Sequence, residues 1–393
     1  MDYFSKKVDR FDWTLTLILF LFFLISCASI FSAQGAAQYD ENFLIKQVFW
    51  YVVGAAIISV AILFDGYQYK LLAWYLYGFG LLLLIAIIVA PTSIAPYRNG
   101  AKSWFIIHGL GIQPSEFVKT FLILALSRVI TQHQEKFKGK SLKLDFLLLL
   151  KLGITTAVPL GLIMLQPDLG TGLVILSILT GLILVSGISW KIILPIYGSG
   201  AGFGAAILYL VVQKPELLVK YLNVKTYQFE RIYSWLDPVN HQSDSGYHLM
   251  KSLTAIGSGL ITGKGFDKGE VYIPEGHTDF IFSIIGEEYG FVGGSIVVGL
   301  FFLLIYHLIK TALDTNDPFN TYVCIGVISV ITFHVFQNIG MTIQVLPITG
   351  IPLPFISYGG SSLMGNMFAM GLVYSMRYHH RTYMFSSGAS VDS

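Results

Sequence analysis

Long apolar stretches dominate the chain, and polar connections separate them. They run approximately over residues 13–31, 44–64, 71–90, 114–130, 146–165, 170–187, 191–212, 280–308, 320–341 and 361–378. A helix rises about 1.5 Å per residue, so about 20 apolar residues suffice to cross the hydrocarbon core of a bilayer. The pattern predicts an all-α polytopic membrane protein with about ten transmembrane helices. We expect residues 1–393 to form one integral membrane domain.

Composition agrees with this class. The 393 residues are 54% hydrophobic and 12% charged, against roughly 25% charged residues in soluble domains. A net charge of +2 and the absence of long Lys/Arg runs argue against a nucleic-acid partner. Cys27 and Cys324 both fall in apolar segments, so neither a disulfide framework nor a cysteine metal motif is expected. The signal-like N-terminus is expected to be an uncleaved first helix, because many more apolar segments follow it.

The positive charges in short connections predict the orientation of the chain. These charges are Lys6, Lys7, Arg10, Lys136, Lys138, Lys140, Lys143, Arg377 and Arg381. All of them fall on one side of the membrane if both termini are cytoplasmic. The large segment 213–279, between spans seven and eight, is then extracytoplasmic, as are the connections 32–43, 91–113 and 342–360.

The large extracytoplasmic segment mixes aromatic residues with cations. They are Tyr221, Tyr227, Phe229, Tyr233, Trp235, Lys220, Lys225 and Arg231. Rings at headgroup depth and cations near anionic groups are typical of a segment that lies in the membrane interface. An ordinary solvated loop is the alternative.

The outer segment 346–360 is apolar, yet it contains three prolines and three glycines. It cannot satisfy its own backbone hydrogen bonds as a helix would. Such backbone at membrane depth must be buried in protein or line a wet cavity. We therefore expect a loop that dips inward and forms a wall of a pocket; a purely structural crossover is the alternative.

Two charged residues stand at the start of the fourth apolar segment. Glu116 and Lys119 are three residues apart, so they share one helix face and can pair. Pro114 is a favourable helix-opening residue. Alternatively, Glu116 serves only the helix N-terminus and Lys119 extends to the membrane surface.

Asp279 directly precedes the eighth apolar segment, in the run Pro274-Glu-Gly-His-Thr-Asp-Phe. A charge at the mouth of a spanning helix persists only where it is paired, hydrated by a cavity or used. Asp279 is therefore the main candidate for chemistry, and a role as helix N-cap is the alternative. Glu287 and Glu288 lie deeper in the same segment and are expected to form ion pairs or to hold a loop. Asp168 is expected to cap the sixth helix or to line the cavity.

Four separated motifs carry a resemblance to a known family. They are Asn99-Gly-Ala-Lys-Ser-Trp-Phe with Gln113-Pro-Ser-Glu-Phe, Gln166-Pro-Asp-Leu-Gly-Thr-Gly, Pro274-Glu-Gly-His-Thr-Asp-Phe-Ile-Phe, and Leu353-Pro-Phe-Ile-Ser-Tyr-Gly-Gly-Ser-Ser. In this order they resemble the SEDS proteins (shape, elongation, division and sporulation), over nearly the whole chain. The first motif, the Gly246-Tyr-His triplet and the stretch from Asn338 to Phe355 resemble the RodA-like elongation branch more than the FtsW-like division branch.

The resemblance implies a peptidoglycan glycosyltransferase in the bacterial cytoplasmic membrane that polymerises lipid II on the outer face. It implies a class B penicillin-binding protein as partner, and elongation-complex cytoskeletal proteins as further candidates. In such a reaction a sugar 4-hydroxyl attacks the anomeric carbon with inversion and expels undecaprenyl pyrophosphate. A base must take the hydroxyl proton, and positive charge must hold the leaving group.

Asp279 is accordingly expected to be the general base, by this argument and by resemblance. The candidates for binding or support are Glu116, Lys119, Trp104, Lys102, Arg98, Arg231, His277 and Ser357. No cofactor is certain, although a divalent cation such as Mg²⁺ or Mn²⁺ could neutralise pyrophosphate with Asp279 or Glu116 as ligands; no ligand spacing establishes one. A lipid II flippase, a division-type polymerase and a non-catalytic scaffold are the alternative functions.

Overall fold

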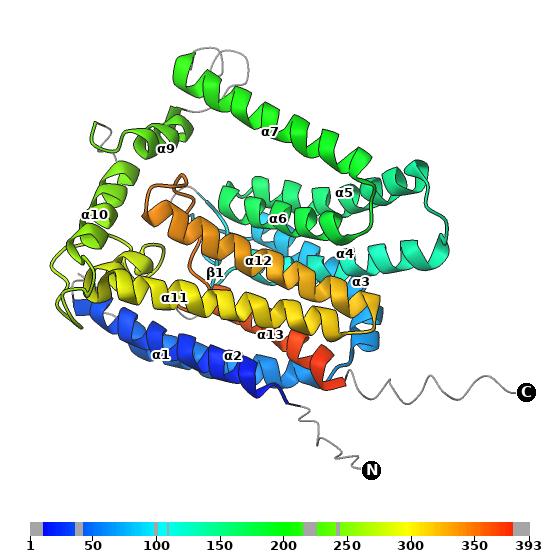
Figure 1. Ribbon diagram of the computed structural model, residues 1–393, viewed down its shortest axis with the longest axis horizontal. Coiled ribbons are helices and arrows are strands. Elements are labelled where there is room, and N and C mark those ends of the chain that lie inside the picture. Colours follow the sequence, from blue (N-terminus) through cyan, green and yellow to red (C-terminus); the bar gives the residue numbers. More distant parts are fainter. Residues whose placement is uncertain are drawn as a thin grey trace, which may run out of the picture.

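Helices make up most of the structure. The computed structural model describes residues 11–35, 42–97, 101–107, 110–214, 226–240 and 244–379. Its helices are α1 (Trp13–Gly35), α2 (Phe43–Ile62), α3 (Gly66–Val89), α4 (Pro114–Lys136), α5 (Leu142–Met164), α6 (Leu169–Val185), α7 (Trp190–Gln213), α9 (Thr226–Leu236), α10 (Asp244–Ser258), α11 (Ile281–Asp314), α12 (Pro318–Thr342) and α13 (Gly360–His379). Each of the ten predicted spans coincides with one of the longer helices. Figure 1 shows α7 lying apart from the bundle that the other longer helices form.

Within the described residues, seven helices are long and apolar enough to cross a membrane: α1, α2, α3, α5, α7, α11 and α12. Helix α6 is apolar but has only 17 residues. Helices α4 and α13 are more polar, and most of their residues are buried. Their side chains face protein rather than lipid, so a lipid-like composition is not required of them. The fold is thus an all-α polytopic membrane fold, while the number of spans stays a prediction.

Short polar residues start several helices. Asn42 caps α2, and Asp65 forms a capping box with Gln68 at the start of α3. Asp317 accepts a hydrogen bond from the Phe319 amide at the start of α12. These side chains satisfy backbone N–H groups that the helices leave free. Helix starts are therefore encoded locally between the apolar segments.

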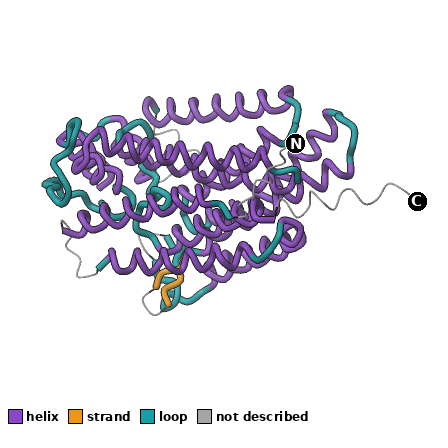
Figure 2. Tube along the Cα trace, turned by 60° about the horizontal axis from the view of Figure 1, so that its bottom comes forward, coloured by secondary structure: helices purple, strands orange, loops and turns teal. Residues whose placement is uncertain are grey.

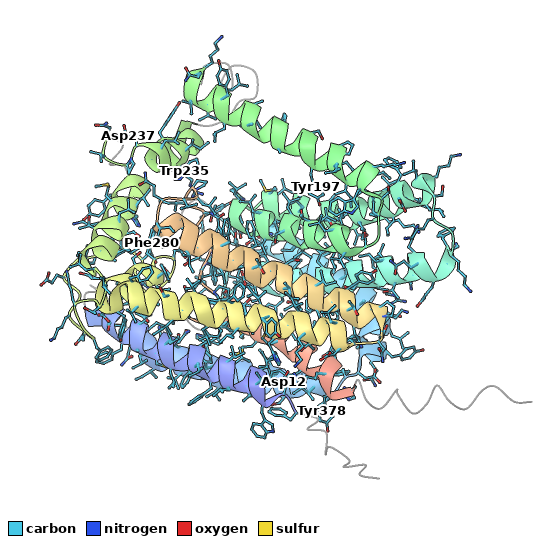
Figure 3. All side chains as sticks on the ribbon, viewed as in Figure 1. Asp12, Tyr197, Trp235, Asp237, Phe280 and Tyr378 are labelled. Carbon is cyan, nitrogen blue, oxygen red and sulfur yellow. The ribbon has the colours of Figure 1, made fainter. Side chains whose placement is uncertain are left out.

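The start of α1, the end of α13 and the connection between α4 and α5 lie at the same end of the bundle (Figure 1). Asp12 lies at this end as well, whereas Trp235 and Phe280 lie at the opposite end (Figure 3). At the Asp12 end, the Asp12 carboxylate accepts hydrogen bonds from Arg377 at 2.6 Å and bonds with His307 at 2.6 Å. This cluster joins the start of α1 to the ends of α11 and α13.

The segment 213–279 contains the helices α9 and α10. Lys220, Tyr221 and Lys225 lie outside the described residues, as do the side chains of Tyr227 and Phe229. The Tyr233 hydroxyl donates to the Val211 carbonyl at 2.7 Å, and the Trp235 indole donates to the Gln344 carbonyl at 3.0 Å. These two rings therefore attach α9 to α7 and to the end of α12.

A small antiparallel hairpin is the one sheet in the described part of the chain. Its strands β1 (Phe105–Ile107) and β2 (Leu110–Ile112) pair Phe105 with Ile112. Figure 2 shows it in orange beside the helical bundle. The hairpin precedes α4 and brings Trp104 to the candidate site described below.

Helix α11 is longer than predicted and is interrupted. It has 34 residues, and Gly290 in its first part has φ 60° and ψ −155°. The segment after α10 fills this interruption: the Phe291 and Val292 amides donate to the Leu260 and Ile261 carbonyls, at 2.9 and 3.1 Å. Backbone groups freed at a helix break need such partners in a membrane protein. The first part of α11, which follows Asp279, is thereby fixed to the segment after α10.

Candidate active site

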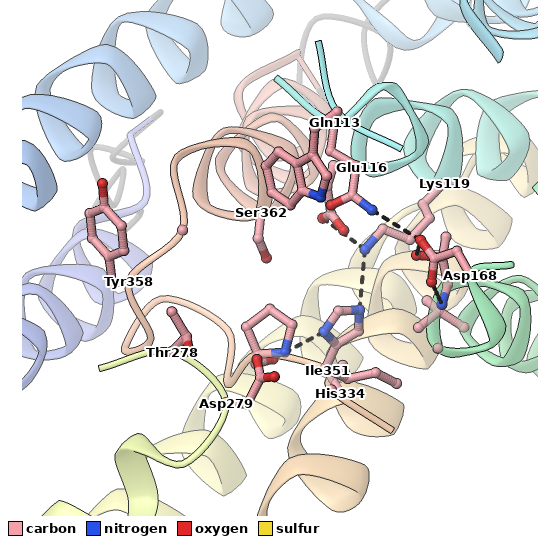
Figure 4. Close-up of a pocket in the computed structure, with 17 residues that line it drawn as sticks. Gln113, Glu116, Lys119, Asp168, Thr278, Asp279, His334, Ile351, Tyr358 and Ser362 are labelled. Carbon is pink, nitrogen blue, oxygen red and sulfur yellow. Dashed lines mark hydrogen bonds and ion pairs between the residues drawn. The ribbon is translucent and has the colours of Figure 1, made fainter. Parts of the chain in front are cut away.

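A cavity of about 170 Å³ lies at the end of the bundle where α4, α6 and α11 begin. It is lined by Trp104, Gln113, Glu116, Lys119, Asp168, Gly170, Thr171, Val174, Thr278, Asp279, His334, Gly350, Ile351, Pro352, Tyr358, Gly359 and Ser362 (Figure 4). Five of these residues come from the loop 346–359, so that loop forms a wall of the cavity, as its prolines and glycines predict. The cavity unites segments that are far apart in the sequence.

Asp279 lines the cavity from the turn before α11. It is not the cap of that helix, because the N-cap is Phe280 and no side chain caps α11. Within the described part of the chain, no hydrogen bond or ion pair is found for its carboxylate. Desolvation by burial, helped by the negative charge of Glu275, raises the pKa of Asp279 to about 7. A carboxylate with that pKa exchanges a proton readily near neutral pH.

Asp279 is held by a hydrogen bond and is closely approached by the backbone of the loop 346–359. Its carbonyl accepts a hydrogen bond from Asn338 Nδ2 at 2.7 Å. A side chain at Gly350 would bring its Cβ within 3.4 Å of Asp279 Oδ2, and Gly350 has φ +72°. Glycine adopts this left-handed conformation without penalty. The loop 346–359 can therefore approach the carboxylate with backbone alone.

Glu116 and Lys119 form the expected ion pair. Lys119 Nζ lies 2.8 Å from Glu116 Oε2, and both side chains are almost fully buried. Lys119 Nζ also lies 3.3 Å from Nε2 of His334, a residue of α12 (Figure 4). Glu116 therefore does more than serve the helix N-terminus, and Lys119 does not extend to the membrane surface. It places a buried cation on the cavity wall.

Asp168 caps α6 and lines the cavity, which are the two roles expected for it. Its Oδ1 accepts from the Thr171 amide at 3.0 Å, and its Oδ2 accepts from the Thr171 hydroxyl at 2.8 Å. Gln113 Nε2 donates to the same Oδ2 at 3.0 Å. Asp168 therefore joins the starts of α4 and α6 and has few acceptor positions left for a ligand.

The other candidates from the sequence are dispersed. Lys102 does not line the cavity, because its ammonium donates to the carbonyls of Ile88, at 3.0 Å, and Ala90. Arg231 is exposed on α9, away from the residues that line the cavity. Arg98 lies outside the described residues. Of the candidate cations with described positions, Lys119 alone lines the cavity.

His277 and Ser357 stabilise the loop 346–359 without lining the cavity. The His277 ring stacks on Phe43 with centroids 4.3 Å apart, and its carbonyl accepts from the Tyr358 amide at 2.9 Å. The Ser357 hydroxyl accepts from the Leu353 amide at 2.8 Å. Both residues shape the loop 346–359, and neither lines the cavity.

Glu287 holds a loop, one of the uses expected for it. Its Oε1 accepts from Lys264 Nζ at 2.8 Å and from the amides of Glu270 and Val271 at 2.9 and 3.1 Å. These contacts tie the segment 264–271 to α11. The segment leads directly into the turn that carries Asp279.

Six polar residues on the cavity wall were not among the candidates from the sequence: Gln113, Thr171, Thr278, His334, Tyr358 and Ser362. A signal for His334 does exist, because it and Asn338 are polar residues four apart in an apolar segment, on one helix face. Among the described residues, no group of three or more His, Cys, Asp or Glu side chains could hold a metal ion.

Comparison with known proteins decides the family. The family model described as "Cell cycle protein", for FtsW, RodA and SpoVE, matches residues 9–382. The chain belongs to this family. It is the SEDS family that the four motifs indicate, and its match spans every element that contributes to the cavity.

Individual members of the family match over almost their full lengths. Stage V sporulation protein E of Bacillus subtilis is 31% identical, with 96% of this chain and 99% of the relative covered. Peptidoglycan glycosyltransferase MrdB of Escherichia coli is 32% identical, with 94% of each chain covered. Peptidoglycan glycosyltransferase RodA of Treponema pallidum is 30% identical, covering 94% of this chain and 98% of the relative. The names of the last two confirm the enzyme class expected from the sequence.

Solved structures of the family share the fold. A chain from a peptidoglycan synthase complex that coordinates polymerization and crosslinking matches with a TM-score of 0.74 at 29% identity, covering 94% of this chain and 98% of that one. The rod shape determining protein RodA of Thermus thermophilus matches with a TM-score of 0.66 at 27% identity, over 94% and 98% of the two chains. The SEDS fold of this protein, an all-α polytopic membrane fold, is thereby confirmed.

Proposed function

We propose that this protein polymerises lipid II into glycan strands on the outer face of the bacterial cytoplasmic membrane. One observation carries the proposal: a single carboxylate of raised pKa and a buried ammonium line the same small cavity. The reaction needs these two groups, a base for the attacking hydroxyl and a cation for the departing pyrophosphate. Pyrophosphate leaves as a stable anion, so no second carboxylic acid is required to protonate it.

Asp279 acts as the base in this proposal. It accepts the proton of the acceptor sugar's 4-hydroxyl as the oxygen bonds to the anomeric carbon of the donor, on the face opposite the pyrophosphate. The configuration at that carbon is inverted. General-base assistance is typically worth about a hundredfold to ten-thousandfold in rate. The pKa of about 7 leaves Asp279 partly ionised near neutral pH, and its hydrogen-bonding positions are open to the hydroxyl.

Lys119 stabilises the leaving group. Its ammonium forms an ion pair with Glu116 and lies within hydrogen-bonding distance of His334 Nε2. An ammonium has three N–H donors, so donors remain for a diphosphate oxygen in the cavity. Glu116 pairs with the buried lysine, and each partner offsets part of the desolvation cost of the other. Trp104 adds an aromatic wall beside this pair.

The cavity admits only the reacting part of the substrate. Its volume of about 170 Å³ is below the range of roughly 300–1,000 Å³ for pockets that enclose a ligand. The sugar and diphosphate region enters it, while the undecaprenyl chain stays among apolar helix surfaces in the bilayer.

A second, apolar cavity provides a place for the partner. It has a volume of about 720 Å³ and lies along α10, α11 and α12. Four glycines of α11 contribute to its wall: Gly286, Gly290, Gly294 and Gly299. Small residues permit close approach of another transmembrane helix. We assign this groove to the single spanning helix of a class B penicillin-binding protein, in line with the related chain that belongs to a synthase complex.

We assign the chain to the elongation branch, with both termini cytoplasmic. The support is the RodA-like passages, which are Asn99–Phe105, the Gly246–His248 triplet and Asn338–Phe355. Relatives carry both RodA-type and FtsW-type names, so the branch rests on these passages. The basic residues near the start of α1, the end of α13 and the α4–α5 connection support the orientation.

The test is lipid II polymerisation by the purified protein with a cognate class B penicillin-binding protein whose transpeptidase is inactive. Wild type is expected to make glycan strands, and Asp279→Asn is expected to bind lipid II without polymerising it. Equal polymerisation by both proteins would refute the base. Transport of lipid II without glycan synthesis by wild type would identify a flippase instead.

A further inference from the structure

Helix α12 presents two buried polar side chains to the candidate active site. His334 is 1% exposed and Asn338 is completely buried. They are four residues apart, so they lie one above the other on the same face of the helix. Burying such groups costs free energy unless they form hydrogen bonds. The proposed reaction uses neither side chain directly, so their contacts require another explanation.

Asn338 holds the base and the loop together. Its Nδ2 donates to the carbonyl of Asp279 at 2.7 Å and to the carbonyl of Ile351 at 2.8 Å. The two amide hydrogens of one side chain thus connect the turn before α11 to the loop 346–359. This loop also carries Gly350, the residue that lies against the Asp279 carboxylate.

One helical turn before Asn338, His334 connects the loop 346–359 to Lys119 in the same way. Its Nδ1 lies 3.3 Å from the Pro352 carbonyl, which can only accept, so Nδ1 carries the proton. Nε2 is then an acceptor and faces the Lys119 ammonium at 3.3 Å. A protonated ring would point an N–H at the ammonium. The contacts therefore fix the neutral ring in one tautomer.

We propose that His334 and Asn338 are positioning residues that set the place of Lys119 relative to Asp279 across the cavity. The inference rests on the proposed function and deepens it. Asn338 and His334, on adjacent turns of α12, bond to the carbonyls of the adjacent loop residues Ile351 and Pro352. The base and the cation thus share one rigid support. His334 also orients the Lys119 ammonium by accepting a hydrogen bond from one of its N–H donors at 3.3 Å.

The neighbouring Gln337 provides a matched control. It is buried on α12, and its Nε2 donates to the Pro347 carbonyl of the same loop at 2.9 Å. It does not line the cavity and has no hydrogen bond to Asp279 or Lys119. Gln337→Met therefore reports the cost of removing a buried hydrogen bond between α12 and the loop, without a direct effect on either reacting group.

The experiment measures kcat and KM for lipid II polymerisation, and the melting temperature, of the complex with the penicillin-binding protein. We compare His334→Phe, His334→Gln and Gln337→Met. Phenylalanine fills the space but accepts no hydrogen bond, whereas glutamine offers an oxygen acceptor toward Lys119. His334→Phe is expected to lower kcat by about tenfold to a hundredfold with KM within about threefold. Displacing a catalytic group by about 1 Å can lower the rate by that factor. His334→Gln is expected to recover kcat to within about threefold of wild type, and Gln337→Met to retain it.

Binding of undecaprenyl pyrophosphate to the same complexes gives a readout without turnover. His334→Phe is expected to bind it about tenfold more weakly than His334→Gln, because one hydrogen bond to a charged group is worth that much. If His334→Phe does not fold, His334→Asn replaces it. Its amide still reaches toward Pro352 but is too short for Lys119, and the same losses are expected.

Three results would overturn the inference. The first is wild-type kcat in His334→Phe, and the second is an equal loss in His334→Phe and His334→Gln. The third is that all three variants lose kcat in proportion to their melting temperature, which would indicate packing alone. Asp279→Asn is measured in parallel: if it polymerises lipid II as wild type does, the proposed function fails and the positioning role fails with it. If it is inactive, each of the three results refutes the positioning role alone.

Discussion

The carboxylate of Glu275 acts on that of Asp279 across the turn that precedes α11. Glu275 is exposed and accepts a hydrogen bond from the Thr278 hydroxyl at 2.8 Å, while Asp279 lines the cavity. Burial is the larger cause of the raised pKa of Asp279, and the charge of Glu275 adds to it. The catalytic proposal therefore makes a prediction about the pH dependence of activity that can be tested without removing Asp279.

Polymerisation is expected to increase with pH in the neutral range. A general base works only when deprotonated, so kcat/KM should rise with an apparent pKa of about 7, the value for Asp279. Glu275→Gln removes the repulsion and should move this pKa downward, so that activity persists at lower pH. The measurement is the pH profile of glycan synthesis for the two proteins. Profiles that coincide, or that lack a rise near pH 7, would contradict the assignment.

Stability should respond to pH in the opposite direction. The pKa of Asp279 is raised in the folded protein, from 3.8 to about 7. Folding therefore favours its protonated form, and this contribution is lost as pH rises from about 4 through 7. Asp279→Asn cannot ionise, so we expect it to melt at a higher temperature than wild type at pH 8 and at a similar temperature at pH 4. Thermal melting of both proteins at the two pH values tests this; a less stable variant at pH 8 would contradict it.

Lys119 and Lys102 test whether a cation must line the cavity. Lys102→Met removes a cation that donates to backbone carbonyls, and it should keep most of the activity. Lys119→Met should lose activity by about a hundredfold or more. It also leaves Glu116 buried without its partner, which costs about 3–5 kcal/mol.

The double variant Glu116→Gln/Lys119→Met separates these two effects. It removes both charges, so it should recover stability relative to Lys119→Met but not recover glycan synthesis. Melting temperature and polymerisation rate are measured for the three variants. Recovery of activity in the double variant would show that Lys119 serves only folding.

The sequence predicted the helices well because the length and apolarity of a span are local properties. It also predicted the Glu116–Lys119 pair, the wall formed by 346–360 and the place of Asp279 at a cavity, because charges or prolines interrupt an apolar pattern there. It could not exclude Lys102, because the direction of a side chain depends on which carbonyls lie nearby in the fold. His334 was missed for the same reason: its importance depends on the approach of α4 to α12 and of the loop to both. The interruption at Gly290 likewise depends on a segment that begins more than 20 residues earlier in the chain.

That interruption leads to a prediction about two neighbouring glycines. A Cβ at Gly259 would lie 1.9 Å from the Gly286 carbonyl oxygen and 2.9 Å from that of Glu287. A Cβ at Gly257 would meet nothing within 4 Å. Both residues have ordinary negative-φ backbone, because neither is among the positive-φ glycines. The two alanine substitutions thus differ mainly in whether they push the segment after α10 away from α11.

Gly259→Ala is expected to destabilise the protein by about 1–3 kcal/mol or more, the usual cost of forcing atoms into a packed contact. Gly257→Ala should be neutral or stabilise by up to about 1 kcal/mol, because it removes freedom from the unfolded chain. Thermal melting of the purified proteins measures both effects. The displaced segment leads through Glu270 and Val271, which Glu287 holds, to Asp279, so Gly259→Ala should also lower the polymerisation rate at temperatures where it remains folded. Equal melting temperatures for the two variants would mean that the segment does not stay packed in the interruption of α11.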